Sequence, residues 1–215
     1  WVVSDTMGNF LIAKTNSFPE FKSQISLSGN LVFRYKDKMH YWNRFNDTIF
    51  RINGNEYEEI FLFKNDDSRI EPADFNDMNS FMTMNKWLPL SIHSVADYLI
   101  LEYQAIQQKQ QRISVWYDIN DSKGIIVNSA EPGSQNIGID NYWDSNIKFC
   151  PEDEVFMNDT KYLVKWFDAV TFKQIIQSKE FKDAAVLYPD KKERLKKLAE
   201  TLPADANPVL MLVAF

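Results

Sequence analysis

The sequence predicts an all-β protein made of β-propeller blades, each an antiparallel four-stranded meander. The main observation comes from residues 31–63, where four short aromatic and β-branched runs follow one another, each ended by a turn of two or three residues. Such short turns leave no room for crossover helices, so neighbouring runs pair antiparallel as hairpins. A four-stranded meander of about 33 residues is the size of one propeller blade.

The same rhythm of strands and turns recurs twice further along the chain. A second meander is expected to start at Ser91, and a third unit near Ile137. Their strand candidates are residues 95–104, 112–119 and 125–127, followed by 148–150, 154–158 and 162–168. This recurrence favours a propeller over the alternative, a β-sandwich, which shares short strands but does not need three similar consecutive meanders.

The segments before and between the meanders are less regular. Residues 1–4 and 10–14 predict a hairpin with Gly8 in its turn, and residues 24–28 a further strand. Residues 64–86 are polar, and we interpret them as an irregular connection that runs over the face of the propeller.

Helix is expected almost only in the final quarter. Apolar residues spaced between 172 and 181 predict a short amphipathic helix, and residues 190–202 predict a longer one that Pro189 opens and Pro203 stops. The apolar run 208–215 then predicts a strand that is buried on both faces and closes the fold.

Length, composition and charge exclude several classes of protein. The chain has 215 residues, of which 45% are hydrophobic, and no Gly/Ser/Pro linker divides it, so we expect a single domain over residues 1–215. A net charge of −6 without a basic stripe argues against a nucleic-acid partner. No apolar run approaches the roughly 20 residues of a membrane span, so no transmembrane segment is predicted.

No local motif predicts catalysis. Cys150 is the single cysteine, which excludes an intrachain disulfide, and we expect it to be a half-buried apolar residue. His40 and His93 lie in strand-like segments and predict structural or surface histidines, because no Cys-His metal set can be assembled. The chain has no nucleophile elbow, phosphate loop or dinucleotide fingerprint. We therefore assign no catalytic residue, no metal and no cofactor.

One loop carries a pattern typical of a ligand-binding surface. In residues 140–144 two large aromatic side chains stand among carboxylates and an amide, as in sugar-binding surfaces, where ring faces stack and oxygens take hydroxyl groups. We expect Trp143 and Asp144 to contact the ligand, and Asp140 and Tyr142 to hold the shape of the loop. The alternative is a structural loop that caps a blade, with Trp143 buried as a packing anchor.

Six segments carry a resemblance to a known family: residues 139–144 (IDNYWD), 149–151 (FCP), 162–169 (YLVKWFDA), 195–202 (LKKLAETL), 207–211 (NPVLM) and 46–52 (NDTIFRI). These segments resemble the uncharacterised six-bladed β-propeller proteins of Bacteroidetes. The resemblance implies a six-bladed propeller that is exported to the periplasm, often as an outer-membrane lipoprotein, without an assigned activity.

A six-bladed ring needs about 240–300 residues at roughly 40–50 residues per blade, and this chain has 215. We therefore expect an incomplete propeller that resembles the C-terminal part of the family, so that the chain is either a fragment or associates with a second copy. Two functions stay open. One is a non-catalytic binding or scaffold module that presents its loops to a glycan, peptide or protein partner; the other is a propeller enzyme acting on a sugar or lactone. The lack of a catalytic motif favours binding.

Overall fold

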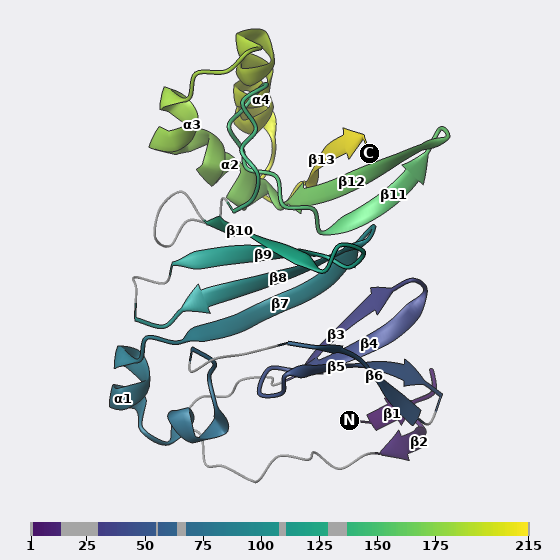
Figure 1. The fold of residues 1–215 in the computed structure, drawn as a ribbon. Helices are drawn as coiled ribbons and strands as arrows, with labels where there is room; N and C mark the ends of the chain where they lie inside the picture. The colour runs from purple at the N-terminus through teal and green to yellow at the C-terminus, as the bar shows by residue number, and fades with distance from the viewer. Residues whose placement is uncertain are drawn as a thin grey trace. The chain divides into compact units, whose positions relative to one another are not determined.

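The computed structural model describes residues 2–13, 30–54, 56–63, 68–107, 111–128 and 137–214. The chain forms two compact units, Trp1–Leu88 and Pro89–Phe215. Most of its regular structure consists of antiparallel sheets, with a few helices (Figure 1). The all-β prediction is thus confirmed at the level of fold class. The strand predicted at residues 24–28 lies outside the described residues.

The first unit contains the predicted opening hairpin and the first meander. The hairpin pairs β1 (Val2–Ser4) with β2 (Phe10–Ala13). The meander is a four-stranded sheet in the order β3-β4-β5-β6. Its strands are β3 (Asn30–Tyr35), β4 (Lys38–Asn43), β5 (Thr48–Asn53) and β6 (Glu56–Leu62).

Turn chemistry explains the first hairpin of this meander. Lys36 and Asp37, between β3 and β4, both have positive φ angles, of 46° and 58°. Two consecutive positive φ angles are the signature of a type I′ turn, whose twist matches that of the two strands. On β4 the side chain of Trp42 is buried, and its Nε1 donates a hydrogen bond of 2.8 Å to the Asn46 carbonyl.

The expectation of an irregular connection over residues 64–86 is wrong in its second half. This segment forms the 3₁₀ helix η1 (Pro72–Asn76) and the helix α1 (Met78–Thr83). Asp77 caps α1 by accepting a hydrogen bond from the Asn79 amide at 3.0 Å. Phe75 and Phe81 are buried with their ring centroids 4.8 Å apart. Two apolar anchors and one cap therefore stabilise helical turns within a polar sequence.

The second meander forms a sheet in the order β10-β9-β8-β7. Its strands are β7 (Trp87–Val95), β8 (Tyr98–Ala105), β9 (Arg112–Asp118) and β10 (Lys123–Asn128). The predicted strand 95–104 is thus wrong at its start, because the hairpin turn lies at Ala96, where φ is 52°. β7 begins before Ser91 and includes Pro89. β7 is the edge strand of this sheet, and edge strands are where proline, which has no N–H to donate, is tolerated.

The third strand-rich segment, predicted to begin near Ile137, forms a three-stranded antiparallel sheet in the order β11-β12-β13. Its strands are β11 (Asp153–Met157), β12 (Thr160–Phe167) and β13 (Val209–Ala214). Residues 148–150, predicted as a strand, contribute only one bridge, from Phe149 to Ile139.

The prediction that the C-terminal strand is buried on both faces is also wrong. Val209 and Met211 of β13 pack against a hydrophobic core. The neighbouring Leu210 and Leu212 point to the opposite face of the sheet and are exposed by 57% and 40%. An apolar run alone predicts a strand here, but it does not tell how many faces the rest of the chain covers.

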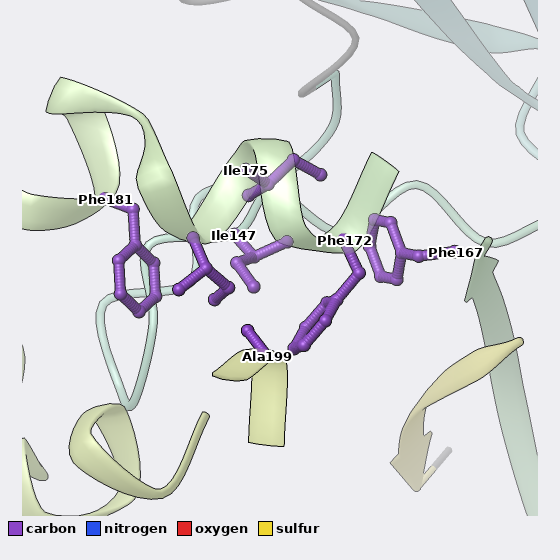
Figure 2. Close-up of a cluster of buried hydrophobic side chains, with 7 residues drawn as sticks. Ile147, Phe167, Phe172, Ile175, Phe181 and Ala199 are labelled. Atoms are coloured by element: carbon purple, nitrogen blue, oxygen red, sulfur yellow. The ribbon is translucent and has the colours of Figure 1, made fainter. Parts of the chain in front are cut away.

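The predicted C-terminal helices are present as α2 (Ala169–Gln177), α3 (Lys179–Asp183) and α4 (Pro189–Thr201). Their apolar faces meet the end of β12 in a core that contains a residue of the preceding loop, Ile147 (Figure 2). The buried members of this core are Ile147, Phe167, Phe172, Ile175, Ile176, Phe181 and Ala199. This core supports the loop that carries the candidate site.

Candidate functional site

The loop with the predicted binding residues is closed at its base by backbone hydrogen bonds. Ile139 and Phe149 exchange two such bonds, each of 2.8 Å. Just before this pair, Gly138 has a φ angle of +135°, and a Cβ atom there would lie 2.3 Å from the Phe149 carbonyl oxygen. Only glycine combines this backbone angle with so close an approach of the two chain segments.

A buried lysine holds both ends of the same loop. Lys165 of β12 donates from Nζ to the carbonyl oxygens of Ile137 and Lys148, each at 3.3 Å. Its ammonium group also lies 5.0 Å from the centre of the Phe167 ring. Burial lowers the pKa of Lys165, an effect that Cys150 and Glu152 oppose electrostatically. Lys165 is therefore a positioning residue that connects β12 to the start and the end of the loop.

The side chain of Asn141 organises the interior of the loop. Its Nδ2 donates to Asp144 Oδ1 at 2.8 Å and to Ser145 Oγ at 3.0 Å, while its Oδ1 accepts from the Trp143 amide at 3.2 Å. Its carbonyl accepts a hydrogen bond of 2.7 Å from the Asn146 amide. Asp144 thus has one carboxylate oxygen engaged within the loop. Because one residue bonds to four neighbours, the loop is held in a defined shape.

Asp140 joins two other residues of the loop. The Tyr142 hydroxyl donates to Asp140 Oδ2 at 2.9 Å, and Lys148 Nζ lies 3.1 Å from Asp140 Oδ1. Partial burial on its own would raise the pKa of Asp140, but the Tyr142 hydrogen bond and Lys148 outweigh it, so this pKa lies below its usual value. The hydrogen bond to Asp140 raises the pKa of Tyr142 in turn.

The loop displays its large side chains to solvent. The side chains of Trp143 and Tyr142 are exposed by 68% and 60%. Two backbone hydrogen bonds join this part of the loop to the segment before α4: Leu187 N to Tyr142 O at 3.0 Å, and Tyr188 N to Trp143 O at 2.8 Å. Leu187 and Tyr188 are exposed as well. Tyr142, Trp143, Leu187 and Tyr188 together form what we call the aromatic patch.

A second buried lysine supports the other half of this patch. Lys192 of α4 donates from Nζ to the carbonyls of Lys182 and Ala184, at 3.1 and 2.6 Å, and lies 5.1 Å from the centre of the Phe181 ring. These contacts fix the chain shortly before Leu187 and Tyr188. The sequence interpretation missed these two residues. Their signal is a pair of large apolar residues directly before the proline that opens α4.

An open groove of about 750 Å³ lies beside the patch. It is lined by the loop (residues 139–145), by every residue of β13, and by the core residues Ile147, Phe149, Phe167, Phe172 and Leu195. Side chains of successive strand residues point to opposite faces, so a groove that touches all of them follows the edge of β13. The groove brings Asp140, Tyr142, Trp143 and Asp144, the four residues predicted from sequence, onto one lining.

The single cysteine and the two histidines of the chain make contacts inside the fold. Cys150 is fully buried rather than half-buried, and burial raises the pKa of its thiol to about 11. His93 places Nε2 at 2.6 Å from the Pro151 carbonyl, an acceptor, so Nε2 carries a proton. His40 is buried and contacts the rings of Phe33 and Tyr35. These contacts are structural.

Across the described ranges of the chain, no cluster of three or more His, Cys, Asp or Glu side chains has the arrangement of a metal site. The helices in these ranges are also too short or too polar to cross a bilayer.

Comparisons with known proteins add a fold-level relation. No protein-family model matches the chain, and no curated protein matches it in sequence. Among solved structures, the chain is similar to the 2.60 Å crystal structure of a protein from Bacteroides fragilis that is thought to be exported, with a TM-score of 0.58 and 14% sequence identity. The similarity covers 100% of this chain and 57% of that protein, so the chain spans little more than half of its neighbour's length. At this identity the relation concerns the fold.

Proposed function

We propose that the protein is a non-catalytic binding or scaffold module whose ligand face is the loop of residues 140–144. Trp143 and Asp144 contact the ligand, while Asp140 and Tyr142 hold the loop in shape. The observation that carries the proposal is the 68% exposure of Trp143 on a loop that hydrogen bonds hold firmly. A structural loop would instead bury this side chain.

The energetic argument rests on preorganisation. An exposed indole leaves apolar surface in water, an unfavourable arrangement that ligand contact relieves. Because Asn141, Lys165 and the two bonds to residues 187 and 188 already order the loop, a ligand need not order it on binding. The combination of aromatic ring faces with the partly exposed Asp144 carboxylate supplies stacking and hydrogen bonding together.

The proposal extends to architecture and location. We propose that the two four-stranded meanders and the three-stranded β11-β12-β13 sheet belong to an incomplete six-bladed propeller; the support is that each meander has four consecutive antiparallel strands, as a propeller blade does. We place the protein outside the cytoplasm, in the periplasm or attached to the outer membrane as a lipoprotein. Support comes from the sequence resemblance and from the fold shared with a Bacteroides fragilis protein thought to be exported. Loops on rigid blades are the usual carriers of function in such folds.

A binding comparison tests the proposal. Wild type, Trp143→Ala, Asp144→Asn and Phe156→Ala are applied to a glycan array and to a peptide array. Phe156 is the matched control, because it is 70% exposed on β11 and lies outside the aromatic patch. The expected result is a loss of at least tenfold in binding for Trp143→Ala and Asp144→Asn, with Phe156→Ala unchanged. Wild-type binding that survives Trp143→Ala would overturn the proposal.

A further inference from the structure

The strand β13 has an open edge. In the sheet order β11-β12-β13 it pairs with β12 alone among the described residues. Val209–Ala214 contains no charged residue and no proline. Natural edge strands usually carry such residues, which discourage pairing with another strand. β13 therefore has no residue that would discourage a further strand from pairing with it.

The register identifies which backbone groups of β13 are available. The Val164 carbonyl accepts a hydrogen bond of 2.8 Å from the Glu152 amide, so the backbone groups of Val164 point toward β11. Because these groups alternate along a strand, those of Lys165 point toward β13. Lys165 stands opposite Met211, whereas Val164 and Trp166 stand opposite Leu212 and Leu210. The N–H and C=O groups of Leu210 and Leu212 therefore point to the open edge.

The groove follows this edge and has a second wall. The loop of residues 139–145 lines it together with all of β13, and its volume of about 750 Å³ lies within the range of ligand sites in proteins. A wall facing the edge leaves space for one extended segment more readily than for the sheet of a second protein copy. The loop wall also carries the carboxylates of Asp140 and Asp144, whereas β13 is uncharged.

We propose that the groove binds an extended polypeptide segment, which adds to β13 as a fourth strand of the β11-β12-β13 sheet. This proposal rests on the proposed function and names the class of its ligand. Main-chain hydrogen bonds to Leu210 and Leu212 supply affinity, and alternate side chains of the segment select its sequence. Apolar side chains meet the lining from Ile147, Phe149 and Phe167, and a basic residue complements the acidic loop wall.

The test uses a phage-displayed library of random decapeptides, selected against the whole chain, with the enriched peptides then synthesised. Two variants at one position separate backbone from side-chain effects. Leu212→Pro removes the outward N–H at a place where an edge strand tolerates proline, and Leu212→Ala keeps that N–H. Circular dichroism checks that both variants retain the sheet. We expect Leu212→Pro to weaken peptide binding at least tenfold and Leu212→Ala less than threefold.

Modified peptides give a second readout that does not depend on protein variants. N-methylation at alternate positions of an enriched peptide should weaken binding at least tenfold in one set of positions and little in the other, because successive N–H groups of a strand point in opposite directions. No enrichment, or binding that is indifferent to methylation and to Leu212→Pro, would overturn the proposal. A concentration-dependent dimer that Leu212→Pro abolishes would assign the edge to a second copy and overturn it as well.

The same experiments separate this proposal from the proposed function. Glycan binding that Trp143→Ala abolishes, in a protein that enriches no peptide, would refute strand addition and leave the loop as the ligand face. Peptide binding that Leu212→Pro weakens but Trp143→Ala does not would support strand addition and refute the role of the loop.

Discussion

Replacing Trp143 with alanine should cost little stability, although tryptophan is the largest side chain in the protein. Truncating a buried Trp or Phe usually costs about 3–5 kcal/mol. Trp143 is 68% exposed, so about a third of its side chain is shielded from water, and the expected cost is roughly 1–1.5 kcal/mol. The loop should survive the change, because the hydrogen bonds of residue 143, to Asn141 and from Tyr188, use its backbone.

The matched comparison is Phe172→Ala. Phe172 is 1% exposed in the core beneath the loop and should show the full cost of about 3–5 kcal/mol. Both residues belong to the second unit, so urea unfolding followed by circular dichroism reports the two variants through the same sheets and helices. A loss of 3 kcal/mol or more for Trp143→Ala would refute the reasoning, since it would identify Trp143 as a packing anchor.

Three further predictions concern the residues around the loop. The pKa of Asp140 is lowered in the folded protein, so its carboxylate contributes stability above the unfolded pKa near 3.8, and this stability is lost as the pH falls through the folded pKa. In Asp140→Asn the free energy of unfolding should therefore fall less between neutral and acid pH than in wild type. An acid-unfolding curve that matches wild type would contradict this prediction. Gly138→Ala should destabilise the second unit by about 2–4 kcal/mol in urea, because residue 138 has a φ of +135° and its added Cβ would meet the Phe149 carbonyl. An unchanged urea midpoint would contradict the close approach of Gly138 to Phe149 at the base of the loop. Cys150, buried and with a thiol pKa raised to about 11, should react with a thiol reagent at pH 8 at least 100-fold more slowly in the folded than in the urea-unfolded protein, and equal rates would show that this thiol is accessible.

The features that could be predicted from sequence are those that short segments determine. Short aromatic and β-branched runs between tight turns predicted β3 to β6, and Pro189 with the spaced leucines predicted α4, because both signals lie within short segments of the sequence. The strand context of His40 and His93 predicted structural or surface histidines, and both rings contact other residues of the fold. The exposure of Trp143, by contrast, depends on which distant segments pack beside it.

Features that long-range contacts determine escaped prediction. The burial of β13 on one face depends on α2 and α4, and no property of the run 209–214 reveals it. Leu187 and Tyr188 join the aromatic patch through hydrogen bonds to a loop 45 residues earlier in the chain, as in Leu187 N to Tyr142 O. Lys165 reads in sequence as an ordinary strand lysine, yet it connects Ile137 to Lys148.

The most direct test of the central claim, that the loop of residues 140–144 is the ligand face, is a ¹H–¹⁵N spectrum of the indole groups. The chain has 6 tryptophans, so the indole signals are few, and that of Trp143 is assigned from the spectrum of Trp143→Phe. A peptide enriched by the library, or a glycan that the array retains, is titrated into the wild-type protein. We predict that the indole signal of Trp143 shifts first and furthest, while that of the buried Trp42 stays in place. Saturable binding that leaves the Trp143 signal unmoved would contradict the account.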